Sequence, residues 1–167
     1  MQTNYKTERL FLRTLTADDS GFIFELVNTA GWLKFIGDRN VKNNEDADKY
    51  IQKIITNTAI NYRVVTLLNN QTAVGVVTLI KRDYLDHPDI GFAFLPAYSK
   101  NGYAFEATKE VLDGLLNSGE HATILATTIP ENSSSIRLLK KLGFNFSKEI
   151  TNEGELLQVF TKDKNEI

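Results

Sequence analysis

The alternation of apolar and polar residues predicts seven strands and four helices along the chain. Strands are indicated by period-2 alternation or short β-branched runs, and helices by apolar residues at i, i+3, i+4 and i+7. The expected strands are residues 9–15, 62–68, 73–81, 88–95, 123–128, 144–150 and 156–161. The expected helices are residues 16–30, 44–55, 102–116 and 133–142. Because the element types keep switching without a linker or repeat, we expect one mixed α+β domain over residues 1–167.

Local residues set the ends of several elements. Thr16 and Asp19 resemble a capping box at the start of the first helix, and Gly31 is expected to end that helix. Asn44 is expected to be the N-cap of the second helix. The polar turn at 69–71 makes its two flanking strands antiparallel neighbours.

The composition limits the compartment and the partners. The chain has no cysteine, so it carries neither a disulfide framework nor a thiolate metal site, and a reducing compartment suits it. A polar start at Met1–Thr7 and the lack of an apolar run of about 20 residues make the cytoplasm the expected location, with no membrane partner. The formal charge of −2 gives no overall attraction to nucleic acid. His87 and His121 are too isolated for a metal site, so we expect none.

The most informative segment is 89–107, where a strand runs through a short polar loop into a helix. A helix N-terminus leaves about four N–H groups unpaired and attracts anions. Gly102 and Ala104 allow close approach to that backbone. Pro96 is expected to end or splay the strand, which would leave a backbone edge free for an extended, amide-rich ligand. Taken alone, Gly102 is better explained by helix packing.

A second segment strengthens the interpretation, because 130–144 carries an Asn-x-x-Ser run followed by Leu-Gly-Phe. Together the two segments resemble the GNAT superfamily of N-acetyltransferases, over nearly the whole chain. The loop from Ser99 to Ala104 fits the pyrophosphate pattern Gln/Arg-x-x-Gly-x-Gly/Ala except at Ser99 itself. The Gly-Tyr-Ala-x-Glu-Ala run and the opening at 7–13 are similar to the Rim-type branch, whose members acetylate N-termini of ribosomal proteins.

The resemblance implies a fold and a bound co-substrate. The fold would be a mixed, mostly antiparallel twisted sheet of about seven strands with about four helices on its two faces. The co-substrate would be acetyl-coenzyme A, with no metal. The residues that would contact it are Phe92, Ala93, Phe94 and Leu95 for pantetheine, Lys100, Asn101, Gly102, Tyr103, Ala104 and Phe105 for the pyrophosphate, and Asn132 and Ser135 near the sulfur. Asn132 is also explained as a turn residue or helix cap.

Acetyl transfer to an amine needs a neutral nucleophile, a donor for the developing oxyanion and a proton for the departing thiolate. The backbone N–H of Ala93 or Phe94 is the candidate oxyanion donor. Asp89 is the candidate base through a water relay, and a solvated carboxylate at a strand start explains it equally well. Many relatives have a tyrosine as general acid where this chain has Leu139, which leaves Ser135 as the substitute.

The acceptor is expected to enter beside the loop at 31–40, where Trp32, Phe35 and Arg39 are candidate substrate contacts. Core cover is the alternative for both aromatic residues, and more so for Phe35. Arg39 could instead pair with Asp38. The acceptor is an amine, either on a small molecule or at a protein N-terminus, and the closing strands could support a homodimer.

Two other functions compete with this one. A non-catalytic sensor or interaction module would bind acyl-coenzyme A without turnover, and Ser99 and Leu139 favour it. A plain nucleotide-binding domain ranks last, since the chain has neither a Gly-x-x-x-x-Gly-Lys-Ser/Thr loop nor a Gly-x-Gly-x-x-Gly after a strand.

Overall fold

One open sheet of eight strands organises the computed structural model, which describes residues 4–166. The strands are β1 Tyr5–Lys6, β2 Leu10–Thr14, β3 Ile60–Leu67, β4 Ala73–Ile80, β5 Asp89–Phe94, β6 Thr123–Thr128, β7 Asn145–Asn152 and β8 Glu155–Asp163. Their order is β1-β2-β3-β4-β5-β6-β8-β7, and every neighbouring pair is antiparallel except β5 and β6. The single domain expected over residues 1–167 stays a prediction, because residues 1–3 and 167 lie outside the described range.

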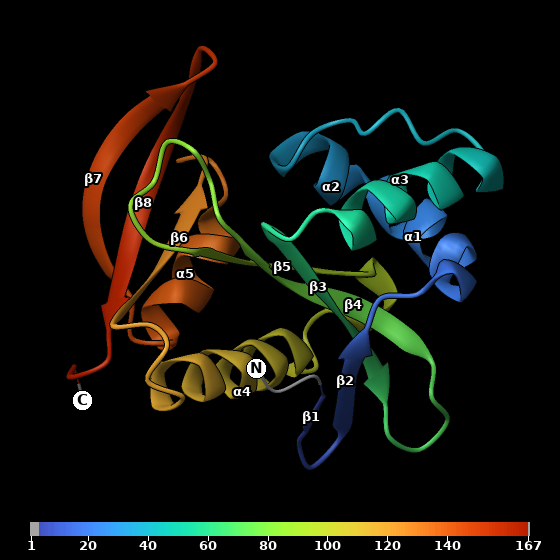
Figure 1. Ribbon diagram of the computed structural model, residues 1–167, viewed down its shortest axis with the longest axis horizontal. Helices are drawn as coiled ribbons and strands as arrows, with labels where there is room; N and C mark the ends of the chain where they lie inside the picture. Colours follow the sequence, from blue (N-terminus) through green and yellow to red (C-terminus); the bar gives the residue numbers. More distant parts are fainter. Residues whose placement is uncertain (1–3, 167) are drawn as a thin grey trace.

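Five α-helices cover the two faces of the sheet. They are α1 Ser20–Val27, α2 Ala30–Phe35, α3 Asn44–Thr56, α4 Tyr103–Asn117 and α5 Ser133–Lys141, with short 3-10 turns η1 Ala17–Asp19 and η2 Pro96–Tyr98. Figure 1 shows α1, α2 and α3 together on one face and α4 on the other. None of the helices between residues 4 and 166 is long and apolar enough to cross a membrane.

The alternation of strand side chains divides the core into two clusters. On one face, Val65 and Ile90 pack with residues of α4 and α5 such as Leu112 and Leu139. On the other face, Val64 packs with residues of α1, α2 and α3. The sheet is therefore buried on both sides in its centre, which explains why β4 is a nearly continuous apolar run.

The mixed, mostly antiparallel fold was predicted correctly, with eight strands in place of about seven and five α-helices in place of about four. The additional strand, β1, is two residues long and has too few positions to show alternation. The first helix is shorter than expected, because α1 ends at Val27 and Gly31 lies inside the separate helix α2. Thr29 adopts an extended backbone and accepts a hydrogen bond from the Trp32 N–H, so it restarts the helix. The N-cap of α3 is Asn43, and the prediction of Asn44 was wrong by one residue.

The capping box at the start of the first helical segment is confirmed and is reinforced by an ion pair. Asp19 accepts a hydrogen bond from the Thr16 N–H at 2.9 Å, as a capping box requires. Its other partner is Arg13 of β2, whose two terminal nitrogens lie 2.9 and 2.7 Å from the carboxylate. Burial by itself raises the pKa of Asp19, but the bonds from Arg13 and Thr16 outweigh it and hold the pKa below its ordinary value. Asp19 thus ties α1 to the sheet.

We expect Asp19→Asn to lower the free energy of unfolding at pH 7 by about 1–2 kcal/mol, because it removes a charged cap and half of a buried ion pair. A depressed carboxyl pKa stabilises the fold above the unfolded value of about 3.9 and loses that effect as the pH falls through the folded value. The difference between the two proteins should therefore shrink in acid. Urea denaturation from pH 7 to pH 3 measures it. Asp18→Asn, at the exposed neighbouring position, is the matched control and should change stability far less.

Candidate active site

The sheet divides where β5 meets β6, its only parallel pair among the described strands. The two strands share one register position, Asp89 opposite Leu125, where the Leu125 N–H donates to the Pro88 carbonyl at 2.8 Å. After this rung the strands separate, and the part of the sheet formed by β6, β8 and β7 stands apart from the rest (Figure 1). The expected free backbone edge on β5 is therefore present.

A side chain ends the parallel ladder. The next rung would place the Thr127 N–H on the Ile90 carbonyl. Instead the Thr127 N–H donates to Asp89 Oδ1 at 3.1 Å, and the Thr127 hydroxyl lies 3.2 Å from Asp89 Oδ2. Pro96 was expected to end or splay the strand. It does the former, since β5 ends at Phe94 and Pro96 begins η2, while the separation of the strands starts several residues earlier. Asp89 holds the two strands apart at the point where they diverge.

Asp89 is a buried carboxylate whose two oxygens accept hydrogen bonds from Arg82 and Thr127. Only 4% of the residue is exposed, so the alternative of a solvated carboxylate at a strand start is wrong. Arg82 Nε donates to Oδ2 at 3.0 Å, and the Arg82 side chain remains 35% exposed. Burial raises the pKa of Asp89 above its ordinary value, although Arg82 and Thr127 act in the opposite direction. The raised pKa suits a proton acceptor, while the occupied oxygens suit a structural group.

Only every second residue of β5 directs its backbone N–H and C=O groups toward the free edge. The Leu95 N–H donates to the Val74 carbonyl of β4 at 2.9 Å. Since alternate residues of an antiparallel strand bond to the same neighbour, Ala93 also bonds to β4. The backbone groups of Phe92 and Phe94 then point away from β4, toward the opening. Of the four expected pantetheine contacts, Phe92 and Phe94 keep an open backbone, and Phe94 replaces Ala93 as the candidate oxyanion donor.

The loop between β5 and α4 has an unusual backbone. Lys100 has φ +64° and Gly102 has φ +79°, so two left-handed residues lie within three positions. Gly102 is the N-cap of α4, and its carbonyl accepts the first helical bond from the Glu106 N–H at 3.0 Å. Glycine adopts this backbone without the clash of a Cβ atom. The left-handed conformation therefore explains a glycine at position 102, in addition to the close approach of a ligand.

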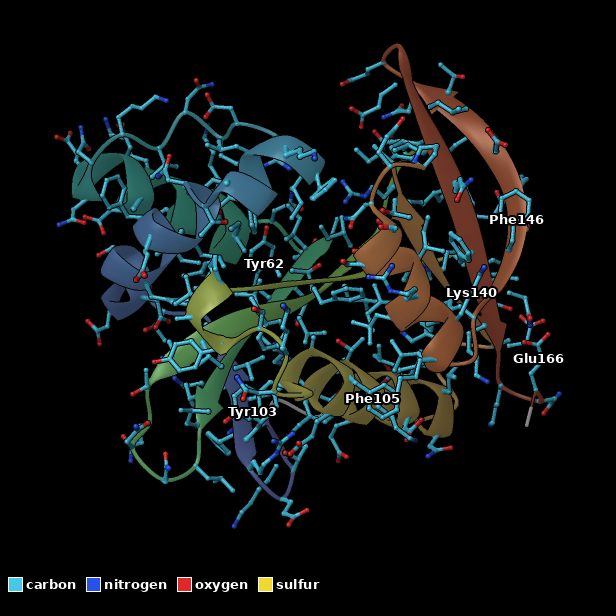
Figure 2. All side chains as sticks on the ribbon, turned by 180° about the vertical axis from the view of Figure 1, so that it is seen from behind. Tyr62, Tyr103, Phe105, Lys140, Phe146 and Glu166 are labelled. Atoms are coloured by element: carbon cyan, nitrogen blue, oxygen red, sulfur yellow. The ribbon has the colours of Figure 1, made fainter. Side chains whose placement is uncertain are left out.

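Two aromatic residues flank the start of α4. Figure 2 shows Tyr103 on the side of β1 and β2, and Phe105 on the side of α5. The Arg9 guanidinium lies 4.6 Å from the centre of the Tyr103 ring, and Lys141 Nζ lies 4.3 Å from that of Phe105. Each aromatic ring is therefore in contact with a cationic side chain, and the charge of Arg9 is paired with that of Glu106.

The residues expected from the next loop are found at the start of α5. Asn132 is its N-cap and accepts a hydrogen bond from the Ser135 N–H at 3.3 Å, which confirms the capping interpretation. Ser135 is half-buried in the first turn of α5. Leu139 is 2% exposed and packs in the core cluster with α4. The position that bears a tyrosine in many relatives is thus filled here by a core residue.

The expected substrate wall differs from the structure. Trp32 is 5% exposed and packs in the core beneath α2, whereas Phe35 is half-exposed with Lys34 Nζ 5.0 Å from its ring centre. Core cover was expected to explain Phe35 more than Trp32, and this was wrong, because Trp32 is the core residue. Asp38 pairs with Lys42, at 3.5 Å, so the pairing considered for Arg39 does not form. The exposed apolar residues of α2 and its end are Leu33 and Ile36.

Two cavities lie outside the expected co-substrate residues. The larger one, about 280 Å³, lies between the loop at 84–87 and strands β6, β7 and β8. The smaller one, about 10 Å³, lies between Tyr5, Arg63 and α4, and has room for one water. The opening between β5 and β6 is bordered by the unpaired backbone edge of β5. Among residues 4–166, no group of three or more His, Asp and Glu side chains is placed to hold a metal.

Thr7, Arg9 and Glu106 were missed by sequence analysis as residues of the site. All three meet at the loop before α4: Glu106 accepts bonds from Thr7 and Arg9, and Arg9 donates to the Asn101 carbonyl. The motif at 7–13 was noted only as part of a resemblance, and nothing in a single sequence joins residues almost one hundred positions apart.

Comparisons with known proteins agree with this geometry. Residues 9–145 match the family model described as the acetyltransferase (GNAT) domain. Among curated proteins, the N-acetyltransferase YnaD of Bacillus subtilis, itself uncharacterized, is 29% identical over 137 residues, 82% of this chain and 79% of YnaD. A GNAT-family acetyltransferase from Bacillus anthracis is 25% identical and has a TM-score of 0.83 over 98% of this chain and 100% of its own. RimL, a ribosomal L7/L12 α-N-protein acetyltransferase crystallised with coenzyme A, shares the fold at 14% identity, with a TM-score of 0.81 over 94% and 95% of the two chains.

Two substitutions at Asp89 separate its hydrogen bonds from its charge. Asp89→Asn keeps an oxygen for the Thr127 N–H and should change stability by less than about 1 kcal/mol at pH 7, whereas Asp89→Ala leaves that N–H without its acceptor and should cost about 1–3 kcal/mol. Because the folded pKa of Asp89 is raised, the wild type should lose stability relative to Asp89→Asn as the pH rises through the window above about 3.9. Urea denaturation measures both effects. Equal costs for the two variants would show that the charge, and not the acceptor, holds β6.

Proposed function

The chain belongs to the GNAT acetyltransferase family, and from this premise we propose that it transfers the acetyl group of acetyl-coenzyme A to a primary amine. The observation that carries the proposal is the unpaired edge of β5 leading directly to the N-terminus of α4. An amide-rich chain can pair with such an edge, and a pyrophosphate suits the unpaired N–H groups of a helix start. One extended molecule that contains both groups in this order is coenzyme A.

In the proposed complex, the backbone of Phe92 and Phe94 pairs with pantetheine, because these residues direct their N–H and C=O groups away from β4. The pyrophosphate lies against the backbone from Gly102 to Phe105. Ala93 and Leu95 contribute through their side chains, which support the strand from the α1–α3 face. Lys100 and Asn101 border the phosphates from exposed positions in the loop, and Asn132 shapes the start of α5.

The reaction follows from these positions. The amine nitrogen forms a bond to the thioester carbonyl carbon, the C–S bond breaks, and sulfur leaves as a thiolate that takes up a proton. The N–H of Phe94 stabilises the negative charge on the carbonyl oxygen, as preorganised backbone donors do. Ser135 is the candidate donor of the proton to sulfur. A thiolate also leaves without a general acid. The buried Leu139, in the position of a tyrosine, therefore does not prevent the reaction.

Asp89 is the candidate base of this proposal. Its raised pKa favours proton uptake, and Thr127 and Arg82 already occupy both carboxylate oxygens. To receive the amine proton through water, Asp89 must give up one of its hydrogen bonds. The half-exposed Arg82 is the partner that can move into solvent. If Asp89 serves only as the acceptor for Thr127, the amine is deprotonated by solvent before it binds.

The acceptor amine enters from the face that carries α1, α2 and α3. Phe35 and Arg39 are its proposed contacts there, with Trp32 supporting them from the core. RimL, which shares the fold, is described as acting on a ribosomal protein N-terminus, and a protein N-terminus or a small amine is the proposed acceptor here. A homodimer through the edge strand β7 stays a prediction.

We expect Gly102→Val to weaken acetyl-coenzyme A binding by at least ten-fold, because the side chain occupies the approach to the helix N-terminus and strains a residue at φ +79°. Calorimetric titration of wild type and variant measures the change. Gly119→Val is the matched control: it sits at φ +81° past the other end of α4, with open space around it, and should lose stability without losing affinity. A wild type that binds neither acetyl-coenzyme A nor coenzyme A would contradict the proposed function.

Asp89→Asn also decides the role of Asp89 in turnover. If Asp89 is the base, kcat falls by about 100-fold or more, a typical contribution of general-base catalysis, while the affinity for acetyl-coenzyme A is kept. If Asp89 only holds the strands apart, kcat stays within a few-fold of wild type. Thiol release with a screen of amine acceptors measures both. Binding with no turnover on any acceptor in the wild type would favour the non-catalytic sensor instead.

A further inference from the structure

The loop that precedes α4 is held from outside by the N-terminal turn between β1 and β2. Glu106, in the first turn of α4, accepts hydrogen bonds from the Thr7 hydroxyl at 2.6 Å and from the Arg9 N–H at 3.1 Å through Oε1. Its Oε2 lies 2.7 Å from Arg9 Nε and 2.6 Å from the terminal nitrogen Nη2. One carboxylate therefore fixes both the backbone and the guanidinium of Arg9.

Arg9 transmits this anchoring to the loop. Its Nη1 donates to the Asn101 carbonyl at 2.9 Å, and its guanidinium lies over the Tyr103 ring. A Cβ atom added at Gly102 would lie 3.4 Å from Arg9 Nη2. Arg9 thus touches Asn101 and Tyr103 and borders Gly102 between them, the three residues that lead into α4.

The anchoring matters because the loop conformation is costly. Lys100 is a non-glycine residue at φ +64°, a backbone that L-residues adopt at a cost of about 1–2 kcal/mol. Within the loop, Ser99 Oγ bonds back to the Pro96 carbonyl and Asn101 Nδ2 to the Ser99 carbonyl. These local bonds leave the Asn101 carbonyl to Arg9. Strained loops persist when surrounding contacts over-determine them.

The anchoring also bears on phosphate binding. Ser99 has a short side chain already bonded to Pro96, so it offers the phosphates no long donor. Affinity for the pyrophosphate then depends on how well the backbone N–H groups of the loop and helix start are oriented. We propose that Thr7, Arg9 and Glu106 are positioning residues that hold this phosphate-binding loop in its binding conformation. The identity of the ligand in this inference rests on the proposed function. The ordering of the loop by Thr7, Arg9 and Glu106 does not.

The electrostatics of Glu106 are consistent with a permanent anchor. Burial by itself raises its pKa, yet the bonds from Thr7 and Arg9 outweigh burial and hold the pKa below the ordinary value. Glu106 is therefore ionised throughout the neutral range. Its negative charge in the first turn of α4 also favours the helix macrodipole.

The test measures loop order and affinity separately. Amide hydrogen exchange over residues 98–106, without ligand, should become on the order of ten-fold faster in Glu106→Gln and Arg9→Met. The amides that report are those of residues 98, 99 and 106, which bond to the carbonyls of residues 95, 96 and 102. The Kd for acetyl-coenzyme A, measured by calorimetry, should rise by on the order of ten-fold in the same variants. Thr7→Val should show a smaller effect of the same sign, and Thr7→Ser, which keeps the hydroxyl, should behave as wild type. Asp113→Asn, which removes the Lys109–Asp113 pair from the same helix, is the control and should change neither quantity.

Each outcome decides one of the two proposals. Unchanged exchange at the bonded amides of residues 98–106 in Glu106→Gln overturns the positioning role whatever the ligand. Faster exchange with unchanged acetyl-coenzyme A affinity also overturns it, because the loop then does not govern binding. If the wild type binds no acetyl-coenzyme A, the proposed function fails, and the exchange measurement alone decides whether Thr7, Arg9 and Glu106 hold the loop.

Discussion

Two adjacent parallel strands exchange hydrogen bonds at every second residue, and β5 and β6 stop doing so after a single rung. The Asp89 carboxylate takes the Thr127 N–H that the next rung would use, so β6 keeps its donor satisfied while β5 keeps its edge open. An open edge in the middle of a sheet would be a defect if nothing paired with it. The whole sheet, with β1 to β5 on one side and β6 to β8 on the other, is arranged around this one substituted hydrogen bond (Figure 1).

The helices convert this opening into a site of defined shape. α4 follows β5 after η2 and a short loop, and its first turn is anchored to the N-terminal turn through Glu106 and Arg9. α5 begins where β6 ends, and Asn132 caps it. Two helix starts therefore border the opening, each fixed by a side chain, one from its own loop and one from the distant N-terminal turn. Polar backbone groups point to the space that an anionic, amide-rich ligand would fill.

Sequence patterns predicted the fold better than the site, for physical reasons that particular residues illustrate. Apolar periodicity reports local burial, and it identified the strands and helices to within a few residues, including β6 at its exact bounds of 123–128. Apolar periodicity missed β1, which has only two residues. It also missed the break at Thr29, where the N-cap of α2 divides one apolar stripe between two helices. The backbone alternation that separates Phe92 and Phe94 from Ala93 depends on strand register, which a single sequence does not contain. The contacts of Arg9 and Glu106 depend on chain crossings almost one hundred residues apart.

The burial of Asp89 and Leu139 bears on how the reaction is divided between the protein and its ligands. Leu139 gives no proton donor, and in the proposed reaction Asp89 accepts a proton only by loosening a bond to Arg82 or Thr127. A thioester has a good leaving group, so holding the reactants in place and stabilising the oxyanion account for most of the barrier that must be removed. The strong, redundant contacts of the molecule are accordingly those that hold β5, β6 and the loop before α4. In the proposed reaction the amine arrives neutral, and the proposal assigns the selection of the substrate to the residues around α2 and not to the strand opening.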